Sequence, residues 1–560
     1  MKHRWFAIAA VFAAIACGML AACCMDCCTD GVDSEYLMPV HPGNGEDVPF
    51  WNGHAVKFTY VPYFDIPEVD GAACYRFTVI PEASAEDTLW FECEDPHMDL
   101  AAIWMDIPVG NVCLTVDARD ASGDTIATVL KRSFLRDFTF DEAEVHQPFR
   151  SLGEAARLNL LAMHRMAYSQ WWKDHIVPEP NFRYNSYPCK IVGATVGVEA
   201  LLAQLYPEMK DEALQCARNA ARFLMDQAQP AGAPLAYFPP TYYNNTVMTS
   251  AAKLSDNQGA TMTMEACSVA DAFLSLFRLT GGQQYYDSAL NIMRTYRRIQ
   301  RPDGSFPIKV NYATGEPLLN VSAMPHPVIL TVARLNREFG VTEFDDMARA
   351  AEKWMADVPV STFDLTGQFE DVPVNGLQPY ENLTYVAAAM YSEYLLYELA
   401  EGHDHGVPME TALDLVRFCE DQFVHWDWLP DENGVRRLPW PAVCEQYKYQ
   451  VPVDDANSTV ARAFLAAYHA TGDERWKAKA EALLATLTHV QHKLSGLIVT
   501  DWYEMTPEEG FSFWPNCAYK SINAMLLYEK YFGAGSCEKP SLTPSDNGTL
   551  LTLLVAGGGA

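Results

Sequence analysis

Positive charge is scarce in this chain. Its 560 residues contain 40 Lys and Arg against 72 Asp and Glu, which gives a formal net charge of -32 at pH 7. A surface of that sign repels nucleic acid and anionic membranes, so broad binding to either is excluded. A single anionic sugar stays possible, because it needs only a few local cations. We therefore expect no nucleic-acid partner.

Motifs for metals, nucleotides and membrane spans are also missing. The sequence contains neither the HExxH pattern of zinc enzymes nor a GxxxxGK[ST] phosphate loop. Beyond the N-terminal leader, no run approaches the roughly 20 apolar residues of a membrane-spanning helix. Cys24, Cys27 and Cys28 resemble a CxxC motif but lack a second ligand pair, and ten further cysteines between Cys74 and Cys537 are scattered. We therefore predict no metal site, and catalysis without an organic cofactor.

The N-terminus has the pattern of a bacterial lipoprotein leader. Lys2 and Arg4 precede a short apolar segment, residues 5–16. Residues 20–23, Leu-Ala-Ala-Cys, then resemble a lipobox, which predicts a signal peptide over residues 1–22, lipidation of Cys23 and a tether over 23–35. The alternative is an ordinary signal peptide with an incidental cysteine. We expect a location in the bacterial cell envelope, on the periplasmic face or the cell surface, with membrane contact through the anchor only.

Residues 36–140 have the period of strands. Short alternating runs such as residues 73–79 and 112–116 are separated by turns rich in Pro, Gly and Asp. This pattern predicts a small antiparallel β-sandwich of the fibronectin type III kind. Trp90 and Trp104 either pack in its core or contact a sugar, and core packing is the more common use of such residues.

From Ser151 onward the apolar residues have helical spacing. We expect twelve helices up to about Phe532, followed by an unassigned C-terminal tail over residues 536–560. Alternate helices are about 60 to 70 residues apart, a spacing that suits large hairpins closing into a ring over residues 150–535. The alternate helices begin near residues 191, 259, 323, 382, 454 and 517.

The connections between these helices are of two kinds. Short ones, such as residues 280–282 and 471–473, alternate with long ones. In a closed ring each kind lies on its own face, and long loops inside a compact domain are usually functional. We therefore expect the site on the face of the long connections. These are residues 174–190, 228–258, 302–321, 358–381, 425–453 and 494–516.

Three segments carry a family resemblance. Residues 468–476, Tyr-His-Ala-Thr-Gly-Asp-Glu-Arg-Trp, resemble the hairpin turn of six-hairpin glycan-active enzymes; residues 278–286 echo it, and residues 300–306 match a helix-ending turn of that superfamily. The resemblance implies a mainly α fold, an (α/α)6 barrel preceded by the β-sandwich. Its members include unsaturated glucuronyl hydrolases, polysaccharide lyases and sugar epimerases. The domain order and lipobox look most like the lipoprotein β-glucuronidases of glycoside hydrolase family 154.

Glycoside hydrolysis needs two carboxyl groups, one to protonate the leaving oxygen and one to activate water or attack the sugar. Glu381 directly precedes an inner helix, and Glu445 lies in an aromatic segment, so both are expected at the mouth of the ring. Asp501 is a third candidate. Asp454 is a fourth, although helix capping is its default explanation. For Glu381, Glu445 and Asp501 the alternative is an ordinary position on the solvated surface.

Substrate-binding candidates come from the same long connections. Cations suit the carboxylate of a uronic acid, and aromatic faces cover the apolar face of a pyranose. Aromatic residues also pack loops, Arg437 fits an exposed turn, and His326 fits a structural role equally well. The candidates are Arg183, Lys309, His326, Arg437, Tyr447, Lys448, Tyr449, Trp428 and Trp502.

Three functions follow from these observations. The favoured one is an exo-acting glycoside hydrolase that removes a terminal uronic sugar from an oligosaccharide or glycan. A second is a polysaccharide lyase or uronyl C5-epimerase, with Tyr447, Tyr449 or His326 as the base. A third is a non-catalytic surface lipoprotein that binds glycans. An oligomer is compatible with all three.

Overall fold

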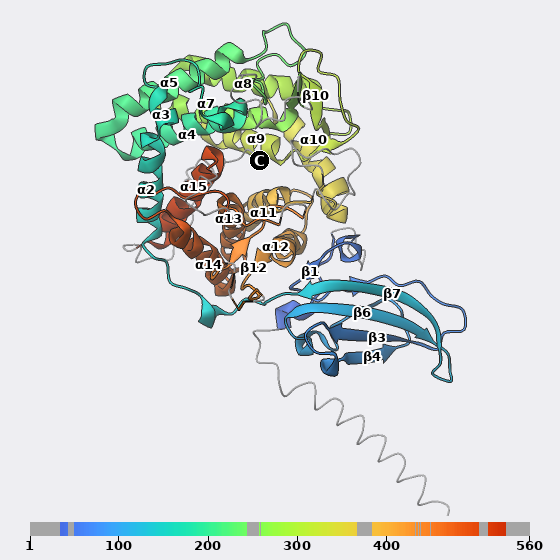
Figure 1. Ribbon diagram of the computed structural model, residues 1–560. Coiled ribbons are helices and arrows are strands. Elements are labelled where there is room, and N and C mark those ends of the chain that lie inside the picture. The colour runs from blue at the N-terminus through green and yellow to red at the C-terminus, as the bar shows by residue number, and fades with distance from the viewer. Residues whose placement is uncertain are drawn as a thin grey trace, which may run out of the picture. The chain divides into compact units, whose positions relative to one another are not determined.

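The chain folds into two compact units, the first over Met1–Val40 and Val56–Thr139 and the second over His41–Ala55 and Phe140–Ala560. A computed structural model shows their helices and strands (Figure 1). The residues that it describes are 34–42, 50–243, 257, 259–366, 383–431, 433–434, 436, 438–447, 450–502 and 513–533.

The first unit is a small β-domain. Its five-stranded sheet has the order β1-β7-β6-β3-β4, antiparallel except that β1 runs parallel to β7, and β2 pairs with β5 in a separate two-stranded sheet. The strands are β1 (Lys57–Phe58), β2 (Tyr63–Phe64), β3 (Cys74–Pro81), β4 (Leu89–Cys93), β5 (Met98–Asp99), β6 (Gly110–Arg119) and β7 (Thr125–Arg136).

One face of the larger sheet forms the core of this unit. Along β3 and β6 buried positions alternate with more exposed ones, as the sequence pattern predicts. Phe77, Phe134 and Trp104 are almost fully buried. Trp90 is 54% exposed instead, and the guanidinium of Arg76 lies 4.1 Å from its ring centroid. The predicted β-domain is therefore confirmed, and core packing describes Trp104 but not Trp90.

The second unit is helical. Six short strands accompany its helices: β8 (Ala260–Met262), β9 (Phe306–Pro307), β10 (Lys309–Asn311), β11 (Ser322–Ala323), β12 (Val424–His425) and β13 (Ala442–Val443). The α-helices are α2 (Leu152–Arg165), α3 (Ala167–Trp171), α4 (Pro188–Leu205), α5 (Lys210–Gln227), α7 (Ala266–Thr280), α8 (Gln283–Ile299), α9 (His326–Phe339), α10 (Asp345–Met355), α11 (Val386–Ala400), α12 (Met409–Phe423), α13 (Asp454–Thr471), α14 (Glu474–Val490) and α15 (Pro515–Phe532).

These helices pair into six hairpins within the described residues: α4 with α5, α7 with α8, α9 with α10, α11 with α12, α13 with α14, and α15 with α2. The first helix of each pair also packs on the first helix of the next, in the order α4, α7, α9, α11, α13, α15, and α15 packs back on α4. Figure 1 shows the labelled helices around this ring. The predicted (α/α)6 barrel is confirmed, including the starts of the inner helices within about seven residues.

Inner and outer helices differ in burial. In α11 every residue from Val386 to Glu398 is buried, whereas α5 buries one face and exposes the other. Helix α4 is long and apolar enough to cross a membrane, but 89% of its apolar window is buried inside the ring. Its composition is therefore that of a core helix.

All six inner helices run the same way, and each is preceded by a long connection. The first five are followed by a short connection to their outer partners, whereas α15 ends the ring and pairs with α2 from its beginning. The N-terminal ends of the inner helices and the long connections consequently share one face, which we call the mouth. The short connections lie on the opposite face.

Ring closure depends on a glycine of α4. A Cβ atom at Gly197 would lie 2.7 Å from the Cε1 atom and 2.9 Å from the hydroxyl oxygen of the buried Tyr519 on α15. At Gly193, one turn earlier, an added Cβ would meet Val269 Cγ2 at 3.6 Å, an ordinary contact. The two glycines on one helix thus differ only in the space beside them.

We predict that Gly197→Ala lowers the free energy of unfolding by about 1–3 kcal/mol, because α4 and α15 must move apart. Gly193→Ala should leave it unchanged or raise it by up to about 1 kcal/mol through helix propensity. Urea unfolding of both variants beside the parent chain measures the difference. Equal effects of the two substitutions would contradict the close α4–α15 contact.

Candidate functional site

Each inner helix places buried polar groups at or near its N-terminal end. Because those ends share one face, charges far apart in the sequence gather at the mouth. These side chains are nine-tenths or more buried, although charged groups normally stay in water. They are Lys190 of α4, Glu265 before α7, His326 of α9, Tyr385 before α11, Asp454 and Asp455 of α13, and Lys520 of α15.

Asp454 and Asp455 form an adjacent acid pair with unequal environments. Asp455 accepts a hydrogen bond from Lys520 Nζ at 3.0 Å and another from Thr459 Oγ1 at 2.9 Å. The side chain of Asp454 accepts a hydrogen bond from Ser521 Oγ at 3.2 Å, and its Oδ1 is buried without a hydrogen-bond partner in the described structure. Complete burial, with the negative charge of Asp455 added, raises the pKa of Asp454 well above its usual range. Asp454 therefore favours its protonated form, whereas Asp455 forms an ion pair with Lys520.

The start of α13 holds the acid pair at the mouth. Val453 is the N-cap residue, so Asp454 and Asp455 occupy the first helical turn rather than the capping position. Asp454 N donates to Thr500 O at 3.2 Å, and the backbone of Asp501 pairs with that of Val453. Asp501 thus lies next to the acid pair through its backbone.

Tyr385 and Glu445 lie beside the same pair. Burial raises the pKa of Tyr385, and the negative charges of Asp455 and Glu445 raise it further. The Glu445 segment is fixed to the start of α11, because Thr384 pairs with Gln446 and Tyr447 N donates to Leu383 O at 3.2 Å. Glu445 is therefore close to the acid pair, as the sequence predicted for a mouth carboxylate.

His326 begins α9 and is 3% exposed. Neither ring nitrogen has a hydrogen-bond partner in the described structure. Burial, with the positive charge of Lys520 added, lowers the pKa of His326 to about 3. Its imidazole is consequently neutral at physiological pH and retains the capacity to accept a proton.

Aromatic residues extend from the acid pair toward α4. Trp514, the N-cap residue of α15, donates its backbone N–H to Thr500 Oγ1 at 2.9 Å. Its half-buried ring lies 5.4 Å from that of Tyr187, which lies 5.9 Å from that of Tyr242. Lys309 Nζ then sits 5.8 Å from the Tyr242 ring centroid. An aromatic path thus runs from Trp514 to Lys309, and Thr500 links Trp514 to the acid pair through backbone N–H groups.

Other predicted residues are engaged within their own loops. The indole of Trp428 donates to Trp440 O at 2.9 Å, and that of Trp502 donates to Val499 O at 3.0 Å. The ring of Tyr447 packs 5.5 Å from that of Phe423. These contacts correspond to the loop-packing alternative for aromatic residues.

Some predictions lie outside the described residues: Cys23, Glu381, Arg437, Lys448 and Tyr449. For Arg183 only the backbone is described, in a 3-10 helix over Arg183–Ser186.

Sequence reasoning missed Asp455, Lys520 and Tyr385 as members of the site. The available signal was a lysine in the first half of an inner helix, in the segment Ala518-Tyr519-Lys520-Ser521. A buried lysine requires a buried acid, and adjacent aspartates at the start of another inner helix are suitable partners.

A cavity of about 720 Å³ lies on the opposite face, near the C-terminal end of α15. Its acids are already paired: Glu529 accepts a hydrogen bond from Arg157 at 2.9 Å, and Glu481 accepts one from Tyr528. It therefore offers fewer unpaired reactive groups than the mouth.

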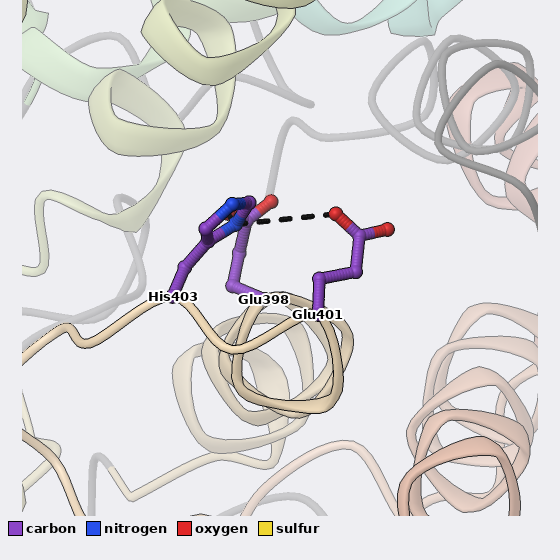
Figure 2. A group of neighbouring side chains, drawn as sticks. All are labelled: Glu398, Glu401 and His403. Atoms are coloured by element: carbon purple, nitrogen blue, oxygen red, sulfur yellow. Dashed lines mark hydrogen bonds and ion pairs between the residues drawn. The ribbon is translucent and has the colours of Figure 1, made fainter.

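The described residues also contain one group with metal-ligand chemistry. Glu398, Glu401 and His403 bring one donor atom each within 4.8 Å of one another at the end of α11 (Figure 2). This group belongs to the face of the short connections, so it is separate from the acid pair.

Comparison with known proteins found no matching family model and no matching curated protein. Solved structures similar to this chain include a family 76 glycoside hydrolase from a bovine Bacteroides thetaiotaomicron strain, 11% identical, covering 81% of this chain and 92% of that one at a TM-score of 0.44. A cellobiose 2-epimerase from Spirochaeta thermophila is 11% identical over 66% and 97%, with a TM-score of 0.43. A polysaccharide lyase is 11% identical over 84% and 64%, with a TM-score of 0.39. Such likenesses assign no activity to this chain.

The acid pair predicts opposite effects of two similar substitutions. The native state binds a proton at Asp454 that the unfolded chain releases above about pH 4, so this group lowers stability as the pH rises. Asp454→Asn should therefore gain stability over the parent chain between pH 4 and pH 7. Asp455→Asn leaves Lys520 buried without its counter-charge and should lose about 3–5 kcal/mol.

Chemical unfolding of both variants at pH 4 and pH 7 tests this asymmetry. A loss of stability at Asp454→Asn that is independent of pH would mean that Asp454 is ionised in the folded chain.

Proposed function

We propose that this chain is a glycoside hydrolase that removes a terminal uronic sugar from a glycan. The observation that carries the proposal is the acid pair, whose two carboxyl groups have different surroundings at the mouth: burial raises the pKa of Asp454, and Asp455 forms an ion pair with Lys520. Glycoside hydrolysis requires that combination, one carboxylic acid and one carboxylate.

Asp454 has the properties of the general acid. Its raised pKa keeps the proton on the carboxyl group near neutral pH, and its unpartnered Oδ1 can deliver that proton to the leaving oxygen. Asp455 forms an ion pair with Lys520, and Glu445 supplies a further carboxyl group nearby. One of these two activates water or attacks the anomeric carbon.

The aromatic path suits the sugar itself. Trp514 is half-buried beside the acid pair, and an indole face covers the apolar side of a pyranose. Lys309 at the far end of the path supplies positive charge for a uronate carboxylate. Positive charge is scarce in this acidic chain, so a lysine at the mouth favours an anionic substrate.

The proposal includes the location of the protein in the cell envelope. The leader pattern before Cys23 supports export and lipid anchoring, which would place the mouth in contact with glycans of the cell envelope or its surroundings. Labelling with a lipid precursor, with Cys23→Ala as the control, tests it.

A second function has its own supporting observation. His326 is neutral and has two unpartnered ring nitrogens, so it can accept a proton next to a uronate carboxylate once the negative charge of the substrate raises its pKa from about 3. Lys520 would then stabilise the anion that forms. That chemistry belongs to a lyase or C5-epimerase.

The products distinguish these functions. With an oligosaccharide that ends in glucuronic acid, hydrolysis releases the uronic acid and a new chain end, and Asp454→Asn should lower kcat by about 10²–10⁴-fold because the general acid is lost. Glu445→Gln should lower it only if Glu445 is the second carboxylate. An unsaturated product indicates elimination, an inverted uronate indicates epimerisation, and binding without turnover indicates a glycan-binding protein.

The uronate preference has a separate test. Lys309→Met should raise KM for the uronic substrate while leaving the matched neutral sugar unaffected, since only the former carries a carboxylate. Lys493→Met, an exposed lysine of the same ring, is the control. If Lys309→Met raises KM equally for the uronic and the neutral substrate, Lys309 does not bind the carboxylate.

A further inference from the structure

We infer that the C-terminal end of α11 and the turn after it form a binding site for a divalent transition metal, with zinc the best-fitting ion. Glu398 lies on the last turn of the helix, and Glu401 and His403 follow it. Figure 2 shows the three side chains pointing toward one another from this short stretch. Two carboxylates and an imidazole are ligands that zinc accepts.

The donor distances suit a zinc ion. At metal–ligand bonds of about 2.0–2.2 Å, tetrahedral donors lie about 3.3 Å apart. Glu398 Oε2 is 2.7 Å from His403 Nδ1, and Glu401 Oε2 is 3.9 Å from the same nitrogen. These separations lie on either side of the required value, so small side-chain rotations would complete the coordination.

His405 lies behind this group and pairs with carboxylates on both sides of its ring. Its Nε2 lies 3.6 Å from Glu398 Oε2, the oxygen that His403 also faces, and its Nδ1 lies 3.2 Å from Glu352 Oε1. Two imidazoles thus approach one carboxylate oxygen. A second group that orients a ligand is the usual surrounding of a metal site, so His405 positions Glu398 for the ion.

The surrounding charges accommodate a divalent cation. Glu352, Glu398 and Glu401 carry three negative charges, and Arg337 offsets one of them through Glu398 Oε1. Oε2 of Glu398 remains directed at the histidines. The C-terminal end of a helix adds partial negative charge, which favours a cation at this position.

The proposed metal site would stabilise the fold and would take no part in the reaction at the mouth. It lies on the face of the short connections, and its ligands bridge the end of α11 and the turn that leads into α12. Bound metal would hold that turn and stabilise the folded chain without entering the mouth.

Zinc titration of the chelator-treated full chain tests the inference. We expect one zinc ion per chain by calorimetry and an increase of the unfolding temperature at saturating zinc. His403→Ala should weaken binding by at least tenfold, and because this side chain is 57% exposed its loss should leave the apo fold intact. His405→Gln, which removes the second imidazole facing Glu398 Oε2, should weaken binding as well.

His97→Ala is the matched control. His97 also pairs with a carboxylate, Asp65, at 2.8 Å and is exposed, but it does not belong to the group of metal-ligand donors found among the described residues. Its substitution should leave zinc binding unchanged. Binding below half an equivalent, or equal losses at His403→Ala and His97→Ala, would overturn the proposal. Glycan turnover measured before and after chelation should be the same, so the outcome is separate from that of the proposed function.

Discussion

The contact between α15 and α4 closes the ring, and the rest of the helical unit depends on that closure. Five neighbouring pairs of inner helices would form an open arc with two unsatisfied apolar edges. The last contact removes both edges, and Gly197 permits it by leaving room for the ring of Tyr519. Once the ring is closed, the direction of every inner helix is fixed, and six N-terminal ends must share a face.

Closure also explains why ionisable groups are buried at that face. An inner helix is surrounded on all sides, so a charged residue in its first turns cannot reach water as it would on an outer helix. Lys520 and Asp455 offset this cost by pairing with each other, whereas Asp454 does so by retaining a proton. The site thus contains groups whose protonation is set by their surroundings, which is the condition for acid–base catalysis.

The two faces of the ring differ in the length of their connections and in how they bring residues together. Long connections at the mouth bring aromatic rings and carboxyl groups together, as an extended substrate needs. On the opposite face the connections are short, and the residues after α11 place Glu398, His403 and His405 together through local geometry alone. Local clusters of this kind suit a metal that fixes a turn, whereas the mouth draws its residues from the N-terminal ends of all six inner helices.

The sequence by itself determined the architecture. Three local properties of the chain can be recognised in the sequence alone. They are helical periodicity, the alternation of short and long connections, and the strand period of residues 36–140. They also led to the prediction of a mouth with Asp454, Glu445 and His326 as candidate residues, and the roles of these residues stay predictions. Only the tertiary structure decided the charge and hydrogen bonding of these groups, because both depend on the residue that each group contacts. Such residues are distant in sequence: Lys520 is 65 residues from Asp455. Burial likewise arises from six helices meeting, so the proton on Asp454 and the neutral ring of His326 could not be derived from the residues alone.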